Sequence, residues 1–191
     1  GLSRVRITGK WSLARMCGSG IIPISSEGLI LYCSIDLMYS KKELADKQQK
    51  FWTAFGQYMR PVPSAFGGQP NWVNYKTGFR NLYFRLDAGR HAARVAIEIT
   101  HKEPEERMRW MKQLKTMRSM IEATIGDDWV WEDQVQDEYG RMMSCIYKDL
   151  PDADLMRQDD WPEIIAFLKE HIILLDACWA EIKEILEAVM N

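Results

Sequence analysis

The sequence is poor in the residues that build metal centres and disulfide frameworks. Its 191 residues include three histidines and four cysteines, and no two cysteines form a CxxC pair, which argues against a zinc site. No apolar run approaches the roughly 20 residues that a membrane helix needs, so we expect no membrane association. We therefore expect a cytoplasmic protein with reduced thiols, in which Cys145 and Cys178 pack as small hydrophobic side chains.

The motifs of familiar enzyme classes are also missing. The chain contains no GxSxG elbow, phosphate loop, dinucleotide fingerprint or HExxH helix. His91 falls in a predicted turn, His101 at the end of a predicted strand and His171 on the predicted final helix, so the histidines do not converge in sequence. No complete catalytic motif is present.

Charge is distributed unevenly along the chain. The formal net charge is −2, but residues 1–121 hold 20 of the 25 Lys and Arg and 9 of the 27 Asp and Glu, a net charge of +11, which leaves −13 for residues 122–191. Such asymmetry can mark a nucleic-acid or acidic partner for the basic part. Because the pI is near 6 and no basic cluster is dense, we favour attraction between the two parts within one fold.

A well-marked helix is predicted shortly after Met38. Ser40 and Glu43 have the spacing of a capping box, in which each side chain reaches the other residue's backbone N–H. Apolar side chains then recur at helical spacing until Pro61 ends the helix.

The region before that helix has a different character. Residues 1–37 are basic, with short apolar patches, and lack the long apolar stretch and small-residue cleavage site of a signal peptide. Our hypothesis is that Met38 is the native start, that 1–37 is an N-terminal extension upstream of it, and that 38–191 is a single domain. The alternative is a genuine N-terminal arm with a strand near 28–35.

Period-two and helical patterns alternate through the rest of the chain. Leu82, Phe84 and Leu86 share one face of a predicted strand, and the following strand alternates in the same way, so an antiparallel hairpin is expected. The expected elements are a short strand at 72–75, strands at 80–87 and 94–101, a helix at 104–125, strands at 129–135 and 141–148, and a last helix from 161. The order helix, hairpin, helix, hairpin, helix predicts an α+β fold with three helices packed on an antiparallel sheet of four or five strands.

Several segments together resemble a known family. They are YSKKELADKQQKFWTAFGQYM, NWVNYKTGFRNLYFRLDA, RVAIEITHK, IYKDL and DDWPEIIAFL. From about Met38 to the C-terminus the chain is similar to the bacterial domain-of-unknown-function family 4268, and most of all to its short, single-domain members; residues 1–37 have no counterpart. The resemblance implies an α+β fold and, because longer relatives occur in nuclease or restriction contexts, an accessory or DNA-related role. It implies no agreed activity and no established catalytic residues.

One enzyme hypothesis can be placed on named residues. A restriction-type nuclease core uses an Asp and a Glu on neighbouring strands to hold Mg²⁺, with a Lys two positions after the Glu. Asp87 and Glu98 lie on successive predicted strands, but Thr100 occupies the lysine position, and Lys102 is the nearest lysine of the same strand parity. Mg²⁺ is the cofactor only under this alternative; otherwise no cofactor is expected.

The expected register weakens that hypothesis. The simplest hairpin pairs Phe84 with Val95, which puts Asp87 at the turn and Glu98 opposite Asn81. The two carboxylates would then be on the order of 20 Å apart, too far to share a metal ion.

The polar face of the same hairpin has a simpler interpretation. Tyr83, Arg85, Arg94 and Glu98 can form cross-strand ion pairs that cover the sheet. A Tyr and Arg surface can also stack on single-stranded nucleic acid or dock a protein. We predict a non-catalytic module that binds a macromolecule, protein or nucleic acid, through these four side chains.

Overall fold

The computed structural model describes residues 41–137 and 139–190, and these form one sheet with helices packed on it. The elements are α2 Lys41–Met59, β1 Leu82–Ala88, β2 Ala92–Ile99, α3 Pro104–Thr116, α4 Arg118–Ile125, β3 Val130–Gln136, β4 Met142–Pro151, a 3₁₀ turn Gln158–Asp160 and α5 Trp161–Met190. The sheet is antiparallel, with strand order β1-β2-β4-β3. The predicted α+β class is confirmed, with four strands and, in the described residues, four α-helices where three were expected.

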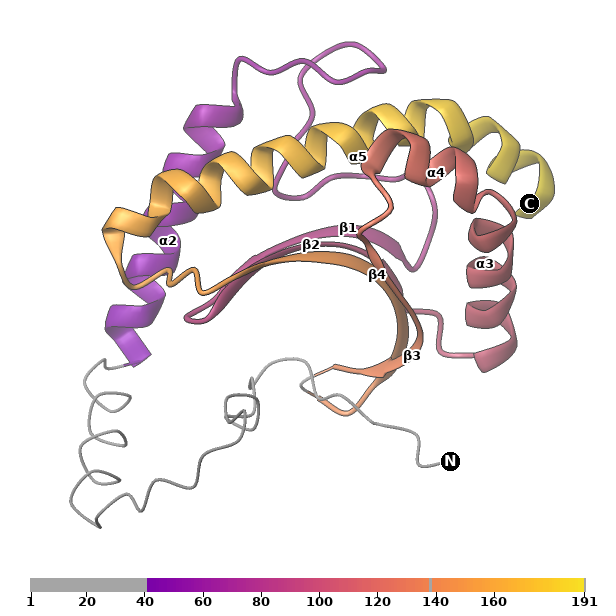
Figure 1. Ribbon diagram of the computed structural model, residues 1–191, viewed down its shortest axis with the longest axis horizontal. Coiled ribbons are helices and arrows are strands. Elements are labelled where there is room, and N and C mark those ends of the chain that lie inside the picture. Colours follow the sequence, from indigo (N-terminus) through magenta and orange to yellow (C-terminus); the bar gives the residue numbers. More distant parts are fainter. Residues whose placement is uncertain (1–40, 138, 191) are drawn as a thin grey trace.

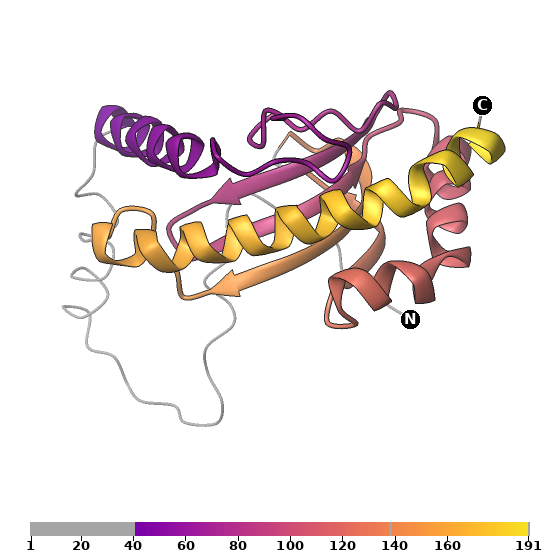
Figure 2. The ribbon, with the colours of Figure 1, turned by 90° about the horizontal axis from the view of Figure 1, so that it is seen from above.

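The helices gather on one face of a strongly curved sheet (Figure 1). The 30-residue helix α5 runs along the whole sheet, α2 lies near its N-terminal end, and α3 and α4 lie near its C-terminal end (Figures 1 and 2). The buried face of the sheet meets the apolar stripe of α5, and the core between them includes Phe84, Val95, Ile97, Ile146, Leu168, Ile172, Leu175 and Trp179. No helix in the described ranges is long and apolar enough to cross a membrane.

The single helix expected at 104–125 is two helices. Met117 departs from helical geometry, with φ −103° and ψ 10°, and its N–H bonds back to the Leu114 carbonyl in a tighter turn. The direction changes there, so that α3 and α4 pack on different parts of the curved core (Figure 1). The sequence has no Gly or Pro at this point, so local signals do not predict the break. Gly126 does end α4, with φ +96°, as expected.

The first hairpin has a different register from the expected one. Phe84 pairs with Ile97 rather than Val95, and Asp87 pairs with Arg94 inside the strands rather than lying at the turn. The turn is held by residues that follow β4, since the Gly89 and His91 carbonyls accept the N–H groups of Leu155 and Asp152 at 2.8 and 3.0 Å. A shift of two positions keeps the same side chains on the core face, so alternation alone could not select the register.

The segment 72–75 is a series of turns and not the expected strand. Trp72 and Tyr75 are buried in the core, and the Trp72 Nε1–H donates to the Val62 carbonyl at 3.1 Å. The Trp179 Nε1–H of α5 donates to the Thr77 carbonyl at 2.9 Å. The buried aromatic side chains of this segment therefore anchor a long loop to the core beside α5.

A buried carboxylate completes this attachment. Asp176 of α5 is 2% exposed and accepts hydrogen bonds from the Ser64 hydroxyl at 2.8 Å, the Ala65 N–H at 2.6 Å and the Tyr75 hydroxyl at 2.5 Å. Burial, together with the hydrogen bond to Asp176, raises the pKa of Tyr75. These contacts join residues more than 100 positions apart in the sequence, so α5 and the loop that precedes β1 form one unit.

Two predictions about the start of the chain fall on residues that the structure does not describe. Ser40, the expected N-cap, lies outside the described residues, and so do Met38 and the whole of 1–37. The domain boundary at Met38 therefore stays a prediction.

Candidate binding surfaces

The predicted binding residues lie together on the sheet face opposite the described helices. Tyr83 pairs with Glu98 across β1 and β2, and Asp87 pairs with Arg94. On the next strand, Asp149 of β4 pairs with Arg94. We call this surface the polar sheet face, and define it as Tyr83, Arg85, Asp87, Arg94, Glu98, Tyr147 and Asp149.

Arg85 connects two of its neighbours on this face. Its Nε lies 3.4 Å from Oε2 of Glu98, and its guanidinium lies 4.6 Å from the centre of the Tyr83 ring. Burial raises the pKa of Glu98, and the nearby Arg85 charge acts in the opposite direction. The cross-strand ion pair that the sequence predicted is present, with Arg85 half exposed and Glu98 mostly buried.

Arg94 is held more tightly than Arg85. Its Nε and Nη2 donate to the two carboxylate oxygens of Asp149 at 2.6 and 2.8 Å, and its guanidinium lies 3.8 Å from the centre of the Tyr147 ring. Burial lowers the pKa of Arg94, but the bidentate contact with Asp149 outweighs it, so the pKa is raised. Tyr147 and Asp149 were not among the predicted binding residues, because alternation along β4 does not reveal that β4 lies beside β2.

A small apolar cluster lies beneath these polar groups. It consists of Ala96, Val135, Met143, Cys145 and Tyr147, all buried. Burial raises the pKa of the Cys145 thiol, and it raises the pKa of Cys178 in the main core to about 12. Thiols with raised pKa values are poor nucleophiles at neutral pH. The two cysteines pack as small hydrophobic residues, as predicted.

The residues of the nuclease hypothesis do not converge. Asp87 and Glu98 pair with Arg94 and Tyr83, four positions apart along the hairpin. The offset is therefore about 13 Å rather than the 20 Å expected, and still exceeds the reach of one metal ion. Lys102 follows the end of β2, in a bend before α3. The described residues hold no group of three or more His, Cys, Asp or Glu side chains that could bind a metal.

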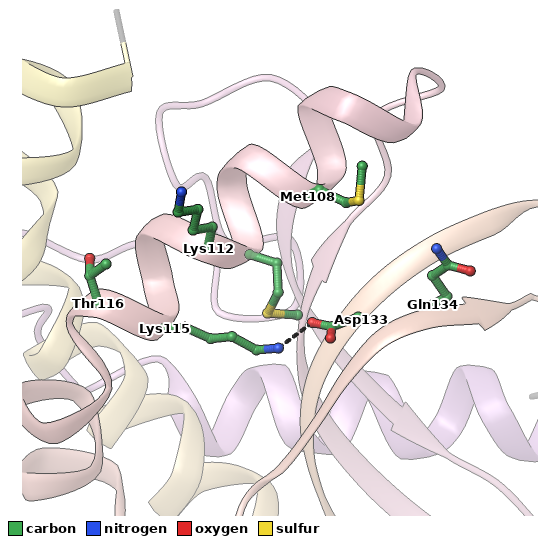
Figure 3. A pocket seen from close by; sticks show the side chains of 7 residues that line it. Met108, Lys112, Lys115, Thr116, Asp133 and Gln134 are labelled. Carbon is green, nitrogen blue, oxygen red and sulfur yellow. Dashed lines mark hydrogen bonds and ion pairs between the residues drawn. The ribbon is translucent and has the colours of Figure 1, made fainter. Parts of the chain in front are cut away.

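A second candidate surface lies between α3 and β3 (Figure 3). This α3–β3 groove has a volume of about 750 Å³ and is lined by Met108, Met111, Lys112, Lys115, Thr116, Asp133 and Gln134. Lys115 reaches from α3 to β3, where its Nζ lies 2.5 Å from Oδ1 of Asp133 (Figure 3). The methionines of this helix were predicted to lie in the core. Met111 is buried, but Met108 is 51% exposed.

β3 contributes an irregular edge to the groove. It is an outer strand of the sheet, and its pairing with β4 is interrupted between Glu132 and Val135. The bulge leaves Asp133 and Gln134 exposed, while the Asp133 carbonyl accepts the Ser144 hydroxyl at 2.5 Å. Only the folded arrangement of α3 against β3 creates this groove, so no local sequence signal identifies it.

These features define a small α+β domain with two candidate binding surfaces. Comparison with known proteins then places it in a family, because residues 47–183 match the family described as a domain of unknown function, DUF4268. The chain therefore belongs to the DUF4268 family, which confirms the resemblance seen in the sequence. No curated protein and no solved structure matches the chain.

Proposed function

We propose that this domain is a non-catalytic module that binds a protein partner through the polar sheet face. The arrangement of arginine and tyrosine side chains supports the proposal. Arg85 lies over Tyr83 and Arg94 lies over Tyr147, so two guanidinium groups are held by aromatic rings and by carboxylates. Arg and Tyr are enriched where protein interfaces gain most of their binding energy, and preorganised side chains lose less entropy on binding.

The charge of the face favours a protein over a nucleic acid. Its two arginines are outnumbered by three acids, Asp87, Glu98 and Asp149, and Arg94 already makes a bidentate contact with one of them. Nucleic-acid binding depends on cations that can neutralise phosphates. A face whose formal charge is −1 would repel a phosphate backbone, whereas a protein with basic and apolar side chains would complement it.

The nuclease alternative has less support. Mg²⁺ would need Asp87 and Glu98 close together, and the strand pairing separates them by four positions. Lys102 is not on the strand that carries Glu98, and its carbonyl accepts Nη1 of Arg107 at 2.9 Å.

A crosslinking experiment tests the protein-binding proposal. The photoreactive residue p-benzoylphenylalanine replaces Tyr83 in the full chain, or replaces Tyr58, an exposed tyrosine of α2, as the matched control. In cells of the source organism, we expect the Tyr83 variant to give a discrete covalent adduct that Arg85→Glu weakens, and the Tyr58 variant to lack it. The same pattern of adducts from both positions, or none from position 83, would contradict the proposal.

Oligonucleotide titration tests the choice of partner. Fluorescein-labelled single- and double-stranded DNA of about 20 nucleotides is titrated with the full chain at several salt concentrations. Near roughly 0.15 M salt, we expect a dissociation constant of about 10⁻⁴ M or weaker, the weak limit of ordinary non-specific binding to DNA. Micromolar binding that weakens steeply with salt and is lost in Arg85→Glu would instead assign the polar sheet face to nucleic acid.

A further inference from the structure

The α3–β3 groove combines an apolar floor with a cationic side. Met111 is buried and Met108 is half exposed, while Lys112 and Lys115 extend from the same helix (Figure 3). None of its lining residues belongs to the polar sheet face, so it is a separate surface. Methionine side chains adapt their shape to different apolar groups, which suits them to a docking site.

The helix that forms one wall carries more cations than acids. It holds Arg107, Arg109, Lys112 and Lys115 against Glu105 and Glu106 of its first turn. Arg109 pairs with Glu106, and buried Arg107 donates to the His101 and Lys102 carbonyls, so the cations that line the groove are Lys112 and Lys115. Lys112 is exposed and makes no ion pair within the described part of the chain. The charge complementary to this wall is negative.

The contact that spans the groove is easily exchanged. Lys115 and Asp133 are 41% and 59% exposed, and ion pairs between solvated side chains contribute little to stability. A carboxylate from a ligand can therefore replace Asp133 on Lys115 at small cost. Asp133 opposes an acidic ligand through its own negative charge and through its hold on Lys115, so neutralising Asp133 should favour such a ligand.

The bulge in β3 determines how an occupant can lie. An unbroken edge strand invites another strand to add to the sheet, and a bulge opposes such pairing. The interruption between Glu132 and Val135 falls at the groove, so side chains rather than a new strand are expected to make the contact. A helical segment that places apolar residues on one face and acids beside them has this form.

We propose that the α3–β3 groove binds an acidic amphipathic helix of a partner protein. An apolar side chain of the helix lies between Met108 and Met111, and its carboxylates pair with Lys112 and with the Lys115 released from Asp133. This inference is independent of the proposed role of the polar sheet face.

Fluorescence anisotropy with a designed peptide tests the groove. The probe is a fluorescein-labelled peptide of about 14 residues, with Leu and Phe at helical spacing and Asp and Glu elsewhere, titrated with the full chain. We expect saturable binding that Lys112→Glu weakens about 10-fold and Met108→Ser about 5-fold. Asp133→Asn is expected to tighten binding by about 2-fold or more, because it removes the competing carboxylate and frees Lys115.

Matched controls separate this binding from general attraction. Lys42→Glu on α2 and Met120→Ser on α4 change exposed residues of the same types outside the groove, and we expect the dissociation constant to stay within about 2-fold of the unmodified chain. A peptide with Ser in place of Leu and Phe should bind at least about 5-fold more weakly.

Three results of the titrations would overturn the proposal. They are the absence of saturable binding, equal weakening by the groove and control variants, and equal affinity for the peptide without apolar residues. A concentration-dependent dimer that Lys112→Glu disperses would also overturn it, and would assign the groove to a second copy of the chain.

Discussion

Among individual residues, the mostly buried Glu98 should make the stability of the fold depend on pH. Its pKa is raised from the ordinary value of 4.5 because burial penalises the ionised form, and Arg85 offsets only part of that penalty. A carboxyl group with a raised pKa in the folded state binds its proton more tightly there than in the unfolded chain. Stability is therefore greatest below the unfolded pKa and falls as the pH rises through the interval up to the folded pKa.

Glu98→Gln should remove this pH dependence. As the pH rises from below to above the ordinary value of 4.5, the free energy of unfolding of Glu98→Gln should improve relative to that of the unmodified chain. Urea denaturation across this range measures the difference, and Glu170→Gln, at an exposed position of α5, is the control expected to show no such trend. A relative loss of stability in Glu98→Gln as the pH rises would mean that the Arg85 contact outweighs burial.

Among the elements, α5 and the loop before β1 depend on one another through Asp176. Asp176→Asn leaves one oxygen and one NH₂ group where two oxygens accept three hydrogen bonds. We expect it to lower the free energy of unfolding by about 2–4 kcal/mol, because a buried donor then faces other donors. Chemical denaturation measures the loss, and Glu184→Gln on the exposed side of α5 should cost less than about 0.5 kcal/mol. An equally small loss of the free energy of unfolding in both variants would show that the Asp176 network contributes little.

Most of the helices and strands could be predicted from local patterns in the sequence. Alternating strands and helix-ending signals such as Gly126 are local, so both hairpins and the α+β class could be predicted. The break at Met117 could not, because no glycine or proline marks it in the sequence. The turns at 72–75 were also missed, because their aromatic residues mimic a buried strand.

Part of the candidate binding site could also be predicted, because strand alternation is a local signal. Strand parity alone places Tyr83, Arg85, Arg94 and Glu98 on one face, and the strand pairing confirms that placement. Their role in binding stays a prediction. Asp149 and the α3–β3 groove depend on which strands and helices become neighbours, and this information is spread over the whole chain.

At the level of the whole molecule, the basic and acidic parts of the chain meet within one fold. Arg94–Asp149 and Lys115–Asp133 each join residues 1–121 to residues 122–191. The Lys115–Asp133 pair is largely solvated, and salt screens such a contact. Apolar burial, rather than attraction between the two parts, should therefore provide most of the stability.

Salt titration tests that balance. From roughly 0.05 to roughly 0.5 M NaCl, we expect the free energy of unfolding to change by no more than about 1 kcal/mol. Equilibrium denaturation at each salt concentration gives the value, and a fall of several kcal/mol would show that long-range attraction between the two parts holds the fold together.

The long helix α5 also has a consequence for the order of synthesis. At 1.5 Å per residue its 30 residues span about 45 Å, and they supply the cover for most of the sheet. All four strands leave the ribosome before α5 does, so the apolar side of the sheet is translated well ahead of the helix that shields it. Nascent chains of this protein therefore expose an apolar sheet face until α5 has been synthesised, and chaperones that bind exposed apolar strands have their best opportunity to act in that interval.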